Sequence, residues 1–449
     1  MKNKSVSVVG LGKLGLPLAA AMASRGYRVT GYDYDAGRIG ALQEGRYPSE
    51  TGLEALLKKH GKNVKFTSNI GAIAGAELIF VVVPTPSLDS GEFSIKSVLS
   101  ALQSIGSALK GKRGNRVVSI VSTVLPGHMA QLKAALEKSS GKTVGKTIGL
   151  CYNPAFIALG NVIENFLKPD FVLIGESDGD SGKLLEGFYR RFCINEPHIH
   201  RMNFVNAEIT KISVNTFVTM KISFGNTLAR ICERIEGAHA DIVSRAIGSD
   251  SRIGQKYLKG AVGYGGPCFP RDNKAFSYMA KSAGIDAHGS EATDRINREQ
   301  IPLIAESALF HSTANDVIAV LGLSYKPDTE VVEESQGVLL ARHLLENGRK
   351  LLLYDPAANA EAARVLPAGV TFARSFRECL DKAGVLILMT PWKEFTEMRP
   401  TDLISKNGHG PRTLIDCWRI WENRELSRYI NYVPLGIGLS RKKPERIRK

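Results

Sequence analysis

Long hydrophobic runs are absent from this sequence. No apolar stretch approaches the roughly 20 residues that a membrane-spanning helix needs. Residues 1–4 lead directly into a short strand-like segment, without the apolar region and cleavage site of a secretory signal. We therefore expect a cytoplasmic protein with no membrane partner. The length of 449 residues exceeds what one hydrophobic core supports and predicts two or three domains.

Closely spaced cysteines are also absent. The six cysteines stand at positions 151, 193, 232, 268, 379 and 417, and no C-x-x-C pair occurs. This scatter argues against a zinc site and against a disulfide framework, so we predict no metal. A chemical role for a single reduced thiol is compatible with this scatter.

Acidic residues are in deficit, because 59 Lys and Arg face 44 Asp and Glu, for a formal charge of +15. Residues 441–449 hold six basic side chains and one acidic one. A short basic tail of this kind is more often solvated and disordered than an arm that binds nucleic acid. We expect no nucleic-acid partner, and the remaining positive charge suits anionic ligands without naming one.

Two stretches of the sequence share one order of strands and helices. In the first, a strand at 5–9 enters a glycine-rich turn and a helix of small residues, a strand at 28–32 ends at Asp33, and a strand at 78–83 runs into prolines. The second has strands at 317–321, 351–354 (ending at Asp355) and 385–389, with a helix near 335–347. Continuous apolar strands that alternate with helices indicate a parallel sheet covered on both faces.

Between these stretches, residues 206–236 form a long helical candidate without proline. The segment is mostly apolar, so we expect a buried helix that joins the two sheets and offers a dimer surface. The predicted fold class is α/β, with two Rossmann-like doubly wound domains joined by a long central helix. The predicted parts are a dinucleotide-binding domain at 1–200, a central helical and dimerisation domain at 201–305, a second Rossmann-like domain at 306–435 and a basic tail at 436–449.

A glycine motif follows the first strand, and it reads Gly10-Leu11-Gly12-Lys13-Leu14-Gly15. Glycines allow the tight turn and the close approach of a pyrophosphate to the start of the next helix. Asp33 stands 18 residues after Gly15, at the end of the second strand. A carboxylate there accepts hydrogen bonds from ribose hydroxyls and repels a 2′-phosphate, which favours NAD over NADP. We therefore predict an NAD site, against the alternative of a structural turn.

Two further strand ends carry hydroxyl groups, in Pro84-Thr85-Pro86 and in Ser122-Thr123-Val124. Ligands of open parallel sheets bind at this edge, although ordinary turn chemistry explains the prolines equally well. On the central helix, Lys211 and Asn215 are four residues apart and share a face. Taken alone, they fit a solvated stripe with Glu208, Thr219 and Asn226 better than a site.

The most unusual segment spans 260–272 and reads GAVGYGGPCFPRD. Four glycines in seven residues bring the backbone close to a neighbour, and the segment then presents Cys268 beside Arg271 and Asp272. Nearby cations favour the nucleophilic thiolate. The usual fate of a cysteine is burial in the core, but the density of glycines here favours a functional thiol.

With these motifs in order, the chain resembles the nucleotide-sugar dehydrogenases of the UDP-glucose/GDP-mannose dehydrogenase family, from about residue 6 to 419. The matching elements are the cysteine loop, Ser122-Thr123-Val124, Asn153-Pro154-x-Phe156, the 206–215 helix segment and Gly322-Leu323-Ser324-Tyr325-Lys326-Pro327. The resemblance implies a four-electron oxidation of a sugar C6 alcohol by two NAD molecules, through a thiohemiacetal and a thioester on the cysteine. UDP-glucose is our first choice of substrate, ahead of UDP-N-acetylhexosamines and GDP-mannose, and a homodimer or higher homo-oligomer is expected.

The resemblance also implies roles for individual residues. Cys268 would attack the aldehyde, Lys211 and Asn215 would stabilise oxyanions, Asp272 would tune the charge beside the thiol, and Thr123 would position water or the substrate hydroxyl. The implied cofactor contacts, beyond the glycine turn with Lys13 and Leu14, are Asp33, Arg38, Thr85, Pro86, Ser122, Thr123 and Arg271. The implied substrate contacts are Phe156, Lys211, Asn215, Tyr257, Gly263, Lys326, Arg419 and, across a dimer interface, Arg252.

Three departures from the family pattern bear on activity. Where the family has Asn-Pro-Glu-Phe-Leu-x-Glu-Gly, this chain has Ala155 and Leu159 in place of both carboxylates. The first of these carboxylates normally moves protons during thioester hydrolysis, which alanine cannot do. Near Glu333, an acid replaces an arginine that contacts NAD in the family. Arg271 replaces a lysine, which keeps the charge but changes the donor geometry.

Two other functions compete with an active dehydrogenase of this family. A catalytically weak or inactive homologue would keep the NAD and nucleotide-sugar contacts but form no NADH that depends on Cys268. A β-hydroxyacid dehydrogenase would share the first domain and a long helix with a lysine. That class needs neither a cysteine loop nor a second α/β domain, so the sequence disfavours it.

Overall fold

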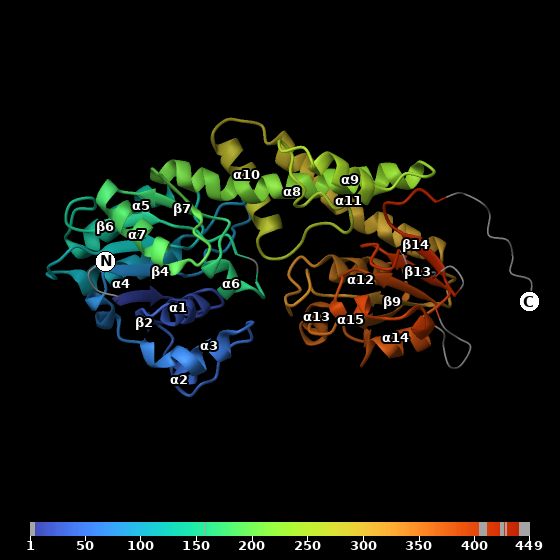
Figure 1. Ribbon diagram of the computed structural model, residues 1–449, viewed down its shortest axis with the longest axis horizontal. Coiled ribbons are helices and arrows are strands. Elements are labelled where there is room, and N and C mark those ends of the chain that lie inside the picture. The colour runs from blue at the N-terminus through green and yellow to red at the C-terminus, as the bar shows by residue number, and fades with distance from the viewer. Residues whose placement is uncertain (1–4, 158, 404–410, 423–425, 427–428, 440–449) are drawn as a thin grey trace, which may run out of the picture. The chain divides into compact units, whose positions relative to one another are not determined.

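A computed structural model describes residues 5–157, 159–403, 411–422, 426 and 429–439 (Figure 1). The chain forms two compact units, Met1–Val214 and Asn215–Lys449. Most of the predicted basic tail lies outside the described residues. The division into parts at 200, 305 and 435 stays a prediction.

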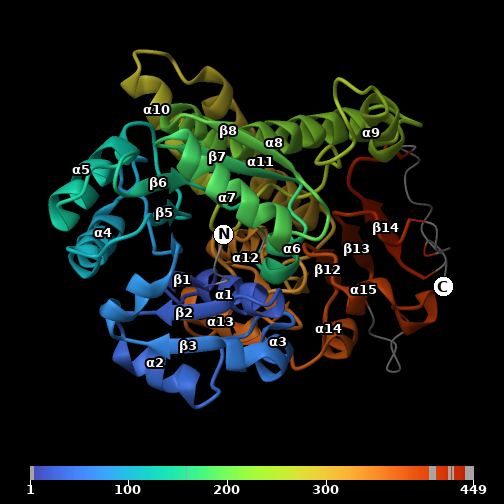
Figure 2. The same cartoon turned by 60° about the vertical axis from the view of Figure 1, so that its left-hand side comes forward.

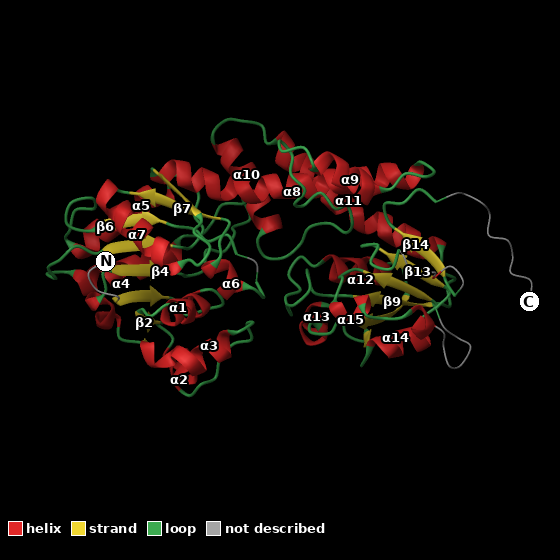
Figure 3. Cartoon of the chain, viewed as in Figure 1, coloured by secondary structure: helices red, strands yellow, loops and turns green. Residues whose placement is uncertain are grey.

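The first unit is built on an eight-stranded sheet (Figure 3) in the order β3-β2-β1-β4-β5-β6-β7-β8. All neighbouring strands are parallel except β6 and β7, which are antiparallel. Alternate residues of the inner strands feed two cores, because successive side chains of a strand point to opposite faces. The strands are β1 (Ser5–Val9), β2 (Arg28–Tyr32), β3 (Val64–Thr67), β4 (Leu78–Val81), β5 (Val117–Ile120), β6 (Gly149–Tyr152), β7 (Phe171–Glu176) and β8 (His198–Met202).

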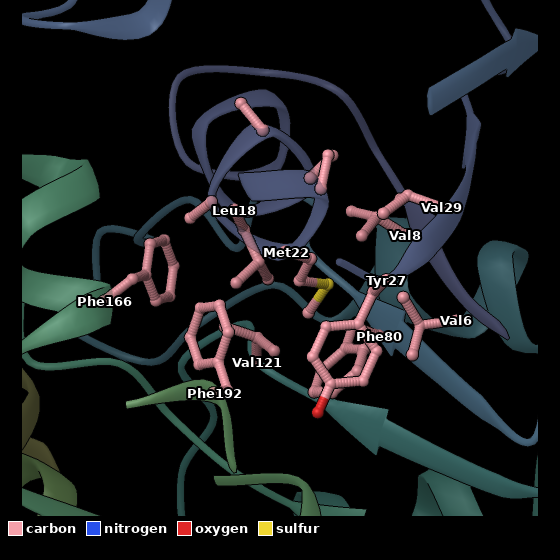
Figure 4. Close-up of a cluster of buried hydrophobic side chains, with 14 of the residues drawn as sticks. Val6, Val8, Leu18, Met22, Tyr27, Val29, Phe80, Val121, Phe166 and Phe192 are labelled. Atoms are coloured by element: carbon pink, nitrogen blue, oxygen red, sulfur yellow. The ribbon is translucent and has the colours of Figure 1, made fainter. Parts of the chain in front are cut away.

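Helices cover both faces of this sheet. Helix α1 is buried along nearly its whole length because its small residues allow close contact with the strands. Figure 4 shows Leu18 and Met22 of α1 in one cluster with Tyr27 and Phe80. Figure 2 shows α4 and α5 packed together on the other face. The helices are α1 (Gly15–Ser24), α2 (Ala36–Gln43), α3 (Leu53–His60), α4 (Lys96–Leu109), α5 (His128–Ser140), α6 (Val162–Leu167) and α7 (Gly179–Phe192).

The predicted central helix is α8, Phe204–Arg234, and residues of both units belong to it. Our expectation that its apolar side chains are buried is wrong for much of the helix. Phe217 is 62% exposed and Phe224 is 54% exposed, whereas Glu208 and Thr219 have no exposed surface. The inward face is therefore largely polar, and its side chains bond to neighbouring loops and helices. The outward face is apolar.

The second unit contains a six-stranded, wholly parallel sheet in the order β11-β10-β9-β12-β13-β14. Numbered from β9, this order is 3-2-1-4-5-6, as expected of a doubly wound Rossmann-like sheet. The strands are β9 (Val317–Leu321), β10 (Lys350–Tyr354), β11 (Thr371–Phe372), β12 (Val385–Leu388), β13 (Thr413–Asp416) and β14 (Asn431–Pro434). The helices are α9 (Ala240–Gly248), α10 (Phe269–Ser282), α11 (His288–Phe310), α12 (Gln336–Glu346), α13 (Asn359–Val365), α14 (Phe376–Lys382) and α15 (Lys393–Thr396).

The predicted fold class is thereby confirmed, with two Rossmann-like sheets and a long central helix. The strands β1, β2 and β9 have the predicted bounds, and the ends of the other predicted strands and helices shift by one or two residues. Apolar residues such as Val82 and Met389 prolong the sequence pattern beyond the last ladder pair of their strands.

Candidate active site

The glycine turn between β1 and α1 is shaped for a dinucleotide. A methyl group on Gly10 would lie 2.3 Å from the Val82 carbonyl oxygen, and one on Gly15 would lie 1.8 Å from the Gly10 carbonyl oxygen. A methyl group on Gly12, in contrast, would meet no atom within 4 Å. Helix α1 has no side-chain cap. The Leu16 N–H bonds to the Gly12 carbonyl oxygen (3.2 Å) and the Leu18 N–H to that of Leu14 (3.0 Å), so the positive end of the helix dipole is what would attract an anion here. The turn is thus tight on its inner side and open on the side that would receive a pyrophosphate.

Asp33 lies at the end of β2 with its carboxylate almost fully buried. Its Oδ2 accepts hydrogen bonds from the Leu11 N–H (2.8 Å) and from Arg38 Nη1 (2.9 Å), and its Oδ1 accepts one from the Asp35 N–H (3.1 Å). A carboxylate offers about four acceptor positions, so one is left for a ribose hydroxyl. The residues present therefore fit NAD, and Arg38 lies next to Asp33 as expected.

The loops that follow β4 and β5 are tied together by a serine. The Ser122 hydroxyl accepts from the Val83 N–H (2.9 Å) and donates to the Val83 carbonyl oxygen (2.6 Å). Thr85 is buried, Pro86 is exposed and Thr123 is partly exposed. The serine thus has a structural task that turn chemistry alone did not suggest, whereas Thr123 stays a prediction.

Lys211 and Glu208 do not belong to a solvated stripe, which corrects our interpretation of that helix face. Lys211 is 5% exposed, and its Nζ donates to the Ala155 carbonyl oxygen (2.9 Å) and lies 4.3 Å from the ring centre of Phe156. Lys211 and Phe156, both predicted to contact the substrate, are therefore brought together. The loop after β6 that lacks the family carboxylate is held by the lysine through its backbone.

Glu208 was missed as a site residue by the sequence reasoning. Its Oε2 accepts from the Gly127 N–H (3.1 Å) and its Oε1 accepts from the Met129 N–H (2.8 Å), at the first turn of α5. Burial raises the pKa of Glu208 in spite of these two bonds. Its position three residues before Lys211 was the available signal, because i and i+3 share a helix face. One face of α8 therefore holds the loops after β5 and β6.

Cys268 is placed differently from the other five cysteines. It occupies the N-cap position of α10 and is partly exposed, whereas Cys151, Cys193, Cys232, Cys379 and Cys417 are buried. Burial raises the pKa of each of these five thiols, to about 12 for Cys193 and Cys379. A helix N-terminus favours a nearby anion. Cys268 is the thiol best placed to react.

The glycines before Cys268 are needed because other backbone approaches closely. A methyl group on Gly265 would lie 2.2 Å from the Glu334 carbonyl oxygen, and the Gly266 N–H donates to the Glu333 carbonyl oxygen (3.0 Å). A methyl group on Gly263 would lie 2.5 Å from Asn297 Oδ1 and 2.6 Å from Gln336 Oε1. Gly263, predicted to contact the substrate, therefore has a packing role in the second unit.

Asp272 has no exposed surface and connects two other predicted site residues. Its Oδ2 accepts from Asn215 Nδ2 (2.6 Å), and its Oδ1 pairs with Arg271 (2.9 Å). Burial lowers the pKa of Arg271, but the charges of Asp272, Cys268 and Glu333 outweigh it, so the pKa is raised. The structure thus brings Asn215, Asp272 and Arg271 together and puts the arginine within the electrostatic reach of Cys268.

Arg419, predicted to hold the diphosphate, is engaged within the second unit. Its guanidinium donates to both carboxylate oxygens of Asp241 (2.7 and 3.1 Å) and to the carbonyl oxygens of Leu435 and Gly260 (2.7 and 2.6 Å). Its side chain has no exposed surface. This geometry supports a structural role, so its contact with a ligand stays a prediction.

Three further predicted substrate residues are accessible. Lys326 is partly exposed, with Nζ 5.9 Å from the ring centre of Tyr325. The Arg252 side chain is 86% exposed and pairs with Asp250 (2.6 Å). Tyr257 is about half exposed and adopts a positive φ of 67°. All three side chains have surface that a ligand or a second chain could reach, and their roles stay predictions.

Sequence comparison assigns every part of this architecture to one family. Residues 4–193 match the NAD binding domain of the UDP-glucose/GDP-mannose dehydrogenase family, residues 205–299 match its central domain, and residues 319–423 match its UDP binding domain. The chain belongs to this family. It is an NAD-dependent nucleotide-sugar dehydrogenase, which confirms the predicted enzyme class and cofactor.

Individual relatives agree with this assignment over nearly the whole chain. It is 30% identical to the UDP-glucose 6-dehydrogenase AglM of Haloferax volcanii, over 95% of this chain and 100% of that one. It is 31% identical to the UDP-glucose 6-dehydrogenase of Pseudomonas aeruginosa, over 87% and 88%. A solved UDP-glucose dehydrogenase from Pyrobaculum islandicum matches with a TM-score of 0.85 and 30% identity, over 97% and 98%.

The described residues form neither a membrane-spanning helix nor a cluster of metal ligands. In the described part of the chain, no helix is long and apolar enough to cross a membrane. Among the same residues, no group of three or more His, Cys, Asp or Glu side chains could hold a metal ion.

Proposed function

We propose that this dehydrogenase oxidises the C6 hydroxyl of UDP-glucose to the carboxylate through a covalent adduct on Cys268. The observation that carries the proposal is the position of this thiol at the N-cap of α10, accessible and within the electrostatic reach of Arg271. A helix N-terminus and a cation both favour the thiolate that the reaction needs. The choice of UDP-glucose is supported by what the relatives are named to act on.

The first unit supplies the residues that would hold NAD. The turn at 10–15 would receive the pyrophosphate at the N-terminus of α1, and Asp33 would accept from the ribose beside Arg38. Thr85, Pro86 and Thr123 lie in loops at the same edge of the sheet, where ligands of open α/β sheets bind. NAD, when bound, accepts hydride, and a four-electron oxidation consumes two molecules of it.

Cys268 divides the oxidation into two stages. Its thiolate would add to the C6 aldehyde and form a C–S bond. The oxyanion formed in this addition takes up a proton to give the thiohemiacetal. Loss of the second hydride leaves a thioester. Water then adds to the thioester carbonyl, the C–S bond breaks, and the thiolate leaves with a carboxylic acid as the product. Lys211 and Asn215 would donate hydrogen bonds to the oxygen that becomes negative in these stages.

Ala155 makes hydrolysis the slow stage in this proposal. A methyl group cannot take a proton from the attacking water, and the nearest polar contact in this loop is the bond from Lys211 to the Ala155 carbonyl oxygen. General acid–base groups typically contribute about 10²–10⁴-fold to a rate. We therefore expect a first burst of NADH and then slow turnover, with the adduct accumulating on Cys268.

Restoring the carboxylate tests this proposal. We expect Ala155→Glu to raise the steady rate of NADH formation by up to about 10²–10⁴-fold, without a matching change in the burst. Ala155→Gln is the control, because it has nearly the same size and no ionisable group. An unchanged rate in Ala155→Glu, with NAD still bound, refutes the role assigned to this position.

A catalytically weak or inactive binding homologue is the second candidate, and the loss of both family carboxylates at 155 and 159 favours it. The two functions separate in a single-turnover assay. An active enzyme forms NADH and a thioester of the expected mass, and Cys268→Ser abolishes the thioester. A binding homologue forms neither.

The substrate is tested by a panel of nucleotide sugars with NAD, read by NADH absorbance and product mass. The panel includes UDP-glucose, two UDP-N-acetylhexosamines and GDP-mannose. We expect the largest kcat/KM for UDP-glucose. A larger value for any other sugar overturns the substrate, though not the enzyme class.

A homodimer through α8 is part of the proposal. Phe217, Phe224 and Ile231 follow each other at intervals of seven residues on its exposed face, and Met220 and Ile235 extend the same stripe. Apolar stripes with this spacing are typical of helices that pair. We expect Phe217→Glu with Phe224→Glu to give monomers in light scattering, whereas the wild type forms dimers. Loss of Arg252-dependent substrate affinity in those monomers would support its predicted role in the partner's site.

A further inference from the structure

A cavity of about 1010 Å³ opens at the edge of the second sheet opposite to its ligand-binding edge. It is lined by the first residues of β9, β10 and β11, by the end of α12 and by the connection at 366–370. In a parallel sheet these are the amino ends of the strands, whereas nucleotides bind beyond the carboxyl ends. We call this cavity the amino-edge pocket, and neither the family descriptions nor the proposed reaction gives it a role.

Positive charge dominates the amino-edge pocket. Its lining includes Arg342, Arg349, Lys350, Arg364 and Lys382, against the single acid Glu346. Two of these cations have carboxylate partners nearby, since Arg364 pairs with Glu361 and Lys382 with Glu378. Five cations less three carboxylates leave a net charge of +2.

The remaining three cations meet no carboxylate among the described residues. Arg342 donates to the Val365 carbonyl oxygen (2.6 Å), and Arg349 donates to the Ser312 hydroxyl (2.8 Å) and to the Thr313 carbonyl oxygen. The Nε of Arg349 is buried and has no hydrogen-bond partner in the described structure. A buried donor without a partner is uncommon in proteins and asks for an acceptor. The charge of these three cations is therefore not neutralised by a carboxylate of the described residues.

Neutralisation of helix ends does not account for these cations. Cations often gather where helices end, because the last carbonyl groups are unpaired. At the end of α12, however, backbone N–H groups of residues 347, 348 and 349 already bond to the carbonyl oxygens of residues 343, 345 and 344. Of the five cations, only Arg342 has a described bond to a helix-end carbonyl. The positive charge thus exceeds what the local backbone uses.

The rest of the amino-edge pocket is apolar. Leu345, Leu351, Leu366 and Val370 contribute aliphatic surface beside the cations. A volume near 1000 Å³ lies at the upper end of the range for sites of small organic ligands and is far larger than an inorganic ion needs. Arginine forks recognise phosphate oxygens in pairs, and the aliphatic walls can accommodate an apolar or weakly polar ring.

We propose that the amino-edge pocket binds a phosphate ester that carries a flat, weakly polar ring, such as a free nucleoside monophosphate. Arg342 and Arg349 hold the phosphate, and the leucines and Val370 contact the ring. The amino-edge pocket is built from residues of the second unit alone, whereas the dinucleotide turn belongs to the first. The proposal does not depend on the reaction proposed above.

Lysine labelling with pyridoxal 5′-phosphate tests this site in the full-length enzyme. The reagent joins a phosphate to a flat ring, its aldehyde condenses with a lysine amine, and borohydride makes the bond permanent. We expect Lys350 to be labelled at least about tenfold faster by pyridoxal 5′-phosphate than by pyridoxal, because one charge-assisted contact is worth about one power of ten. Lys393, whose side chain is 84% exposed outside the pocket, is the matched control and should show a ratio near one. Equal ratios at the two lysines overturn the proposal.

Variants and competitors extend the test. Arg342→Ala should remove the preference for the phosphorylated reagent, and Glu346→Gln should strengthen it, so a folding defect in one variant leaves the other informative. Uridine 5′-monophosphate should protect Lys350 at about a tenfold lower concentration than inorganic phosphate, since about 60 Å² of buried apolar surface has that effect. Equal protection by the two competitors overturns the ligand class. If neither variant changes the preference of Lys350 for the phosphorylated reagent, the proposed site is overturned.

Discussion

Two glycines of the dinucleotide turn should respond in opposite ways to the same small change. Gly15→Ala would put a methyl carbon 1.8 Å from the Gly10 carbonyl oxygen, whereas Gly12→Ala would put one where no atom lies within 4 Å. The first methyl group must displace backbone. The second meets nothing in the protein, but it occupies the side of the turn on which we expect the pyrophosphate.

The size of each effect follows from these contacts. Forcing a methyl group into packed surroundings typically costs about 1–3 kcal/mol. At about 2–4 °C for each kcal/mol in a unit of this size, Gly15→Ala should lower the Tm of the first unit by about 2–12 °C. Gly12→Ala should leave the Tm unchanged or raise it slightly, because alanine restricts the unfolded chain by about 0.4–1 kcal/mol. A clash of similar size with NAD should weaken binding by about 5–150-fold.

Thermal unfolding followed by circular dichroism, with NAD affinity from calorimetry, measures both effects. Binding of UDP-glucose in the absence of NAD is the control for each variant. A Tm loss in Gly12→Ala equal to that in Gly15→Ala would refute the assignment of an open side. So would a stable Gly12→Ala variant that binds NAD as tightly as the wild type.

Three further predictions follow from the described contacts. At pH 8 a thiol with a pKa of about 12 is ionised in about one molecule in ten thousand, so iodoacetamide should modify Cys268 well before Cys193 or Cys379 in peptide maps of the native enzyme. Glu208→Ala should destabilise the first unit by about 1–3 kcal/mol in urea unfolding, because the buried Met129 N–H loses its acceptor, whereas the more exposed Gly127 N–H can bond to water instead. Burial raises the pKa of Asp241, but the hydrogen bonds and charge of Arg419 outweigh burial, so the pKa is lowered. The pair therefore stabilises the folded state at pH values above the ordinary carboxyl pKa of about 3.9. This stabilisation is lost as the pH falls through the pKa of Asp241 in the folded state. Arg419→Gln should therefore cost about 3–5 kcal/mol at pH 7 and much less near pH 2, and an equal cost at both pH values would contradict the pairing.

The sequence predicted the strands and the glycine turn well because their signals are local. Continuous apolar runs and turn glycines report on the few residues around them. Helix α8 shows where this reasoning fails. Its apolar residues predicted burial, yet Phe217 and Phe224 are exposed and Glu208 is buried. Burial of a long helix depends on which partners meet each face, and for Glu208 those partners lie 81 and 79 residues away in the chain.

The candidate site could be predicted as a set of residues but not as a set of contacts. Spacing alone pointed to Cys268 and Asp272, and the structure adds that Asp272 connects Asn215 to Arg271. The spacing of residues in the sequence did not indicate that Arg419 would pair with Asp241, because an arginine after a strand can bind a phosphate or a carboxylate equally well. Only the hydrogen bonds seen in the structure separate an arginine that is open to a phosphate from one that is already paired with a carboxylate.

Asp33 and Asp355 stand at equivalent positions of the two Rossmann-like sheets, and they differ in how many hydrogen bonds each accepts from the protein. Asp33 ends the second strand of the first sheet and accepts three hydrogen bonds, which leaves about one of its four acceptor positions unused. Asp355 ends the second strand of the other sheet and accepts six, four of them on Oδ2 from Leu323, Ser324 and Trp392. Beyond the donors that have a counterpart at Asp33, Asp355 accepts from the N–H and the hydroxyl of Ser324, from the Ala358 N–H and from Trp392 Nε1. Asp33 therefore keeps an acceptor position for a ribose hydroxyl, whereas the acceptor positions of Asp355 are filled by donors of the protein itself.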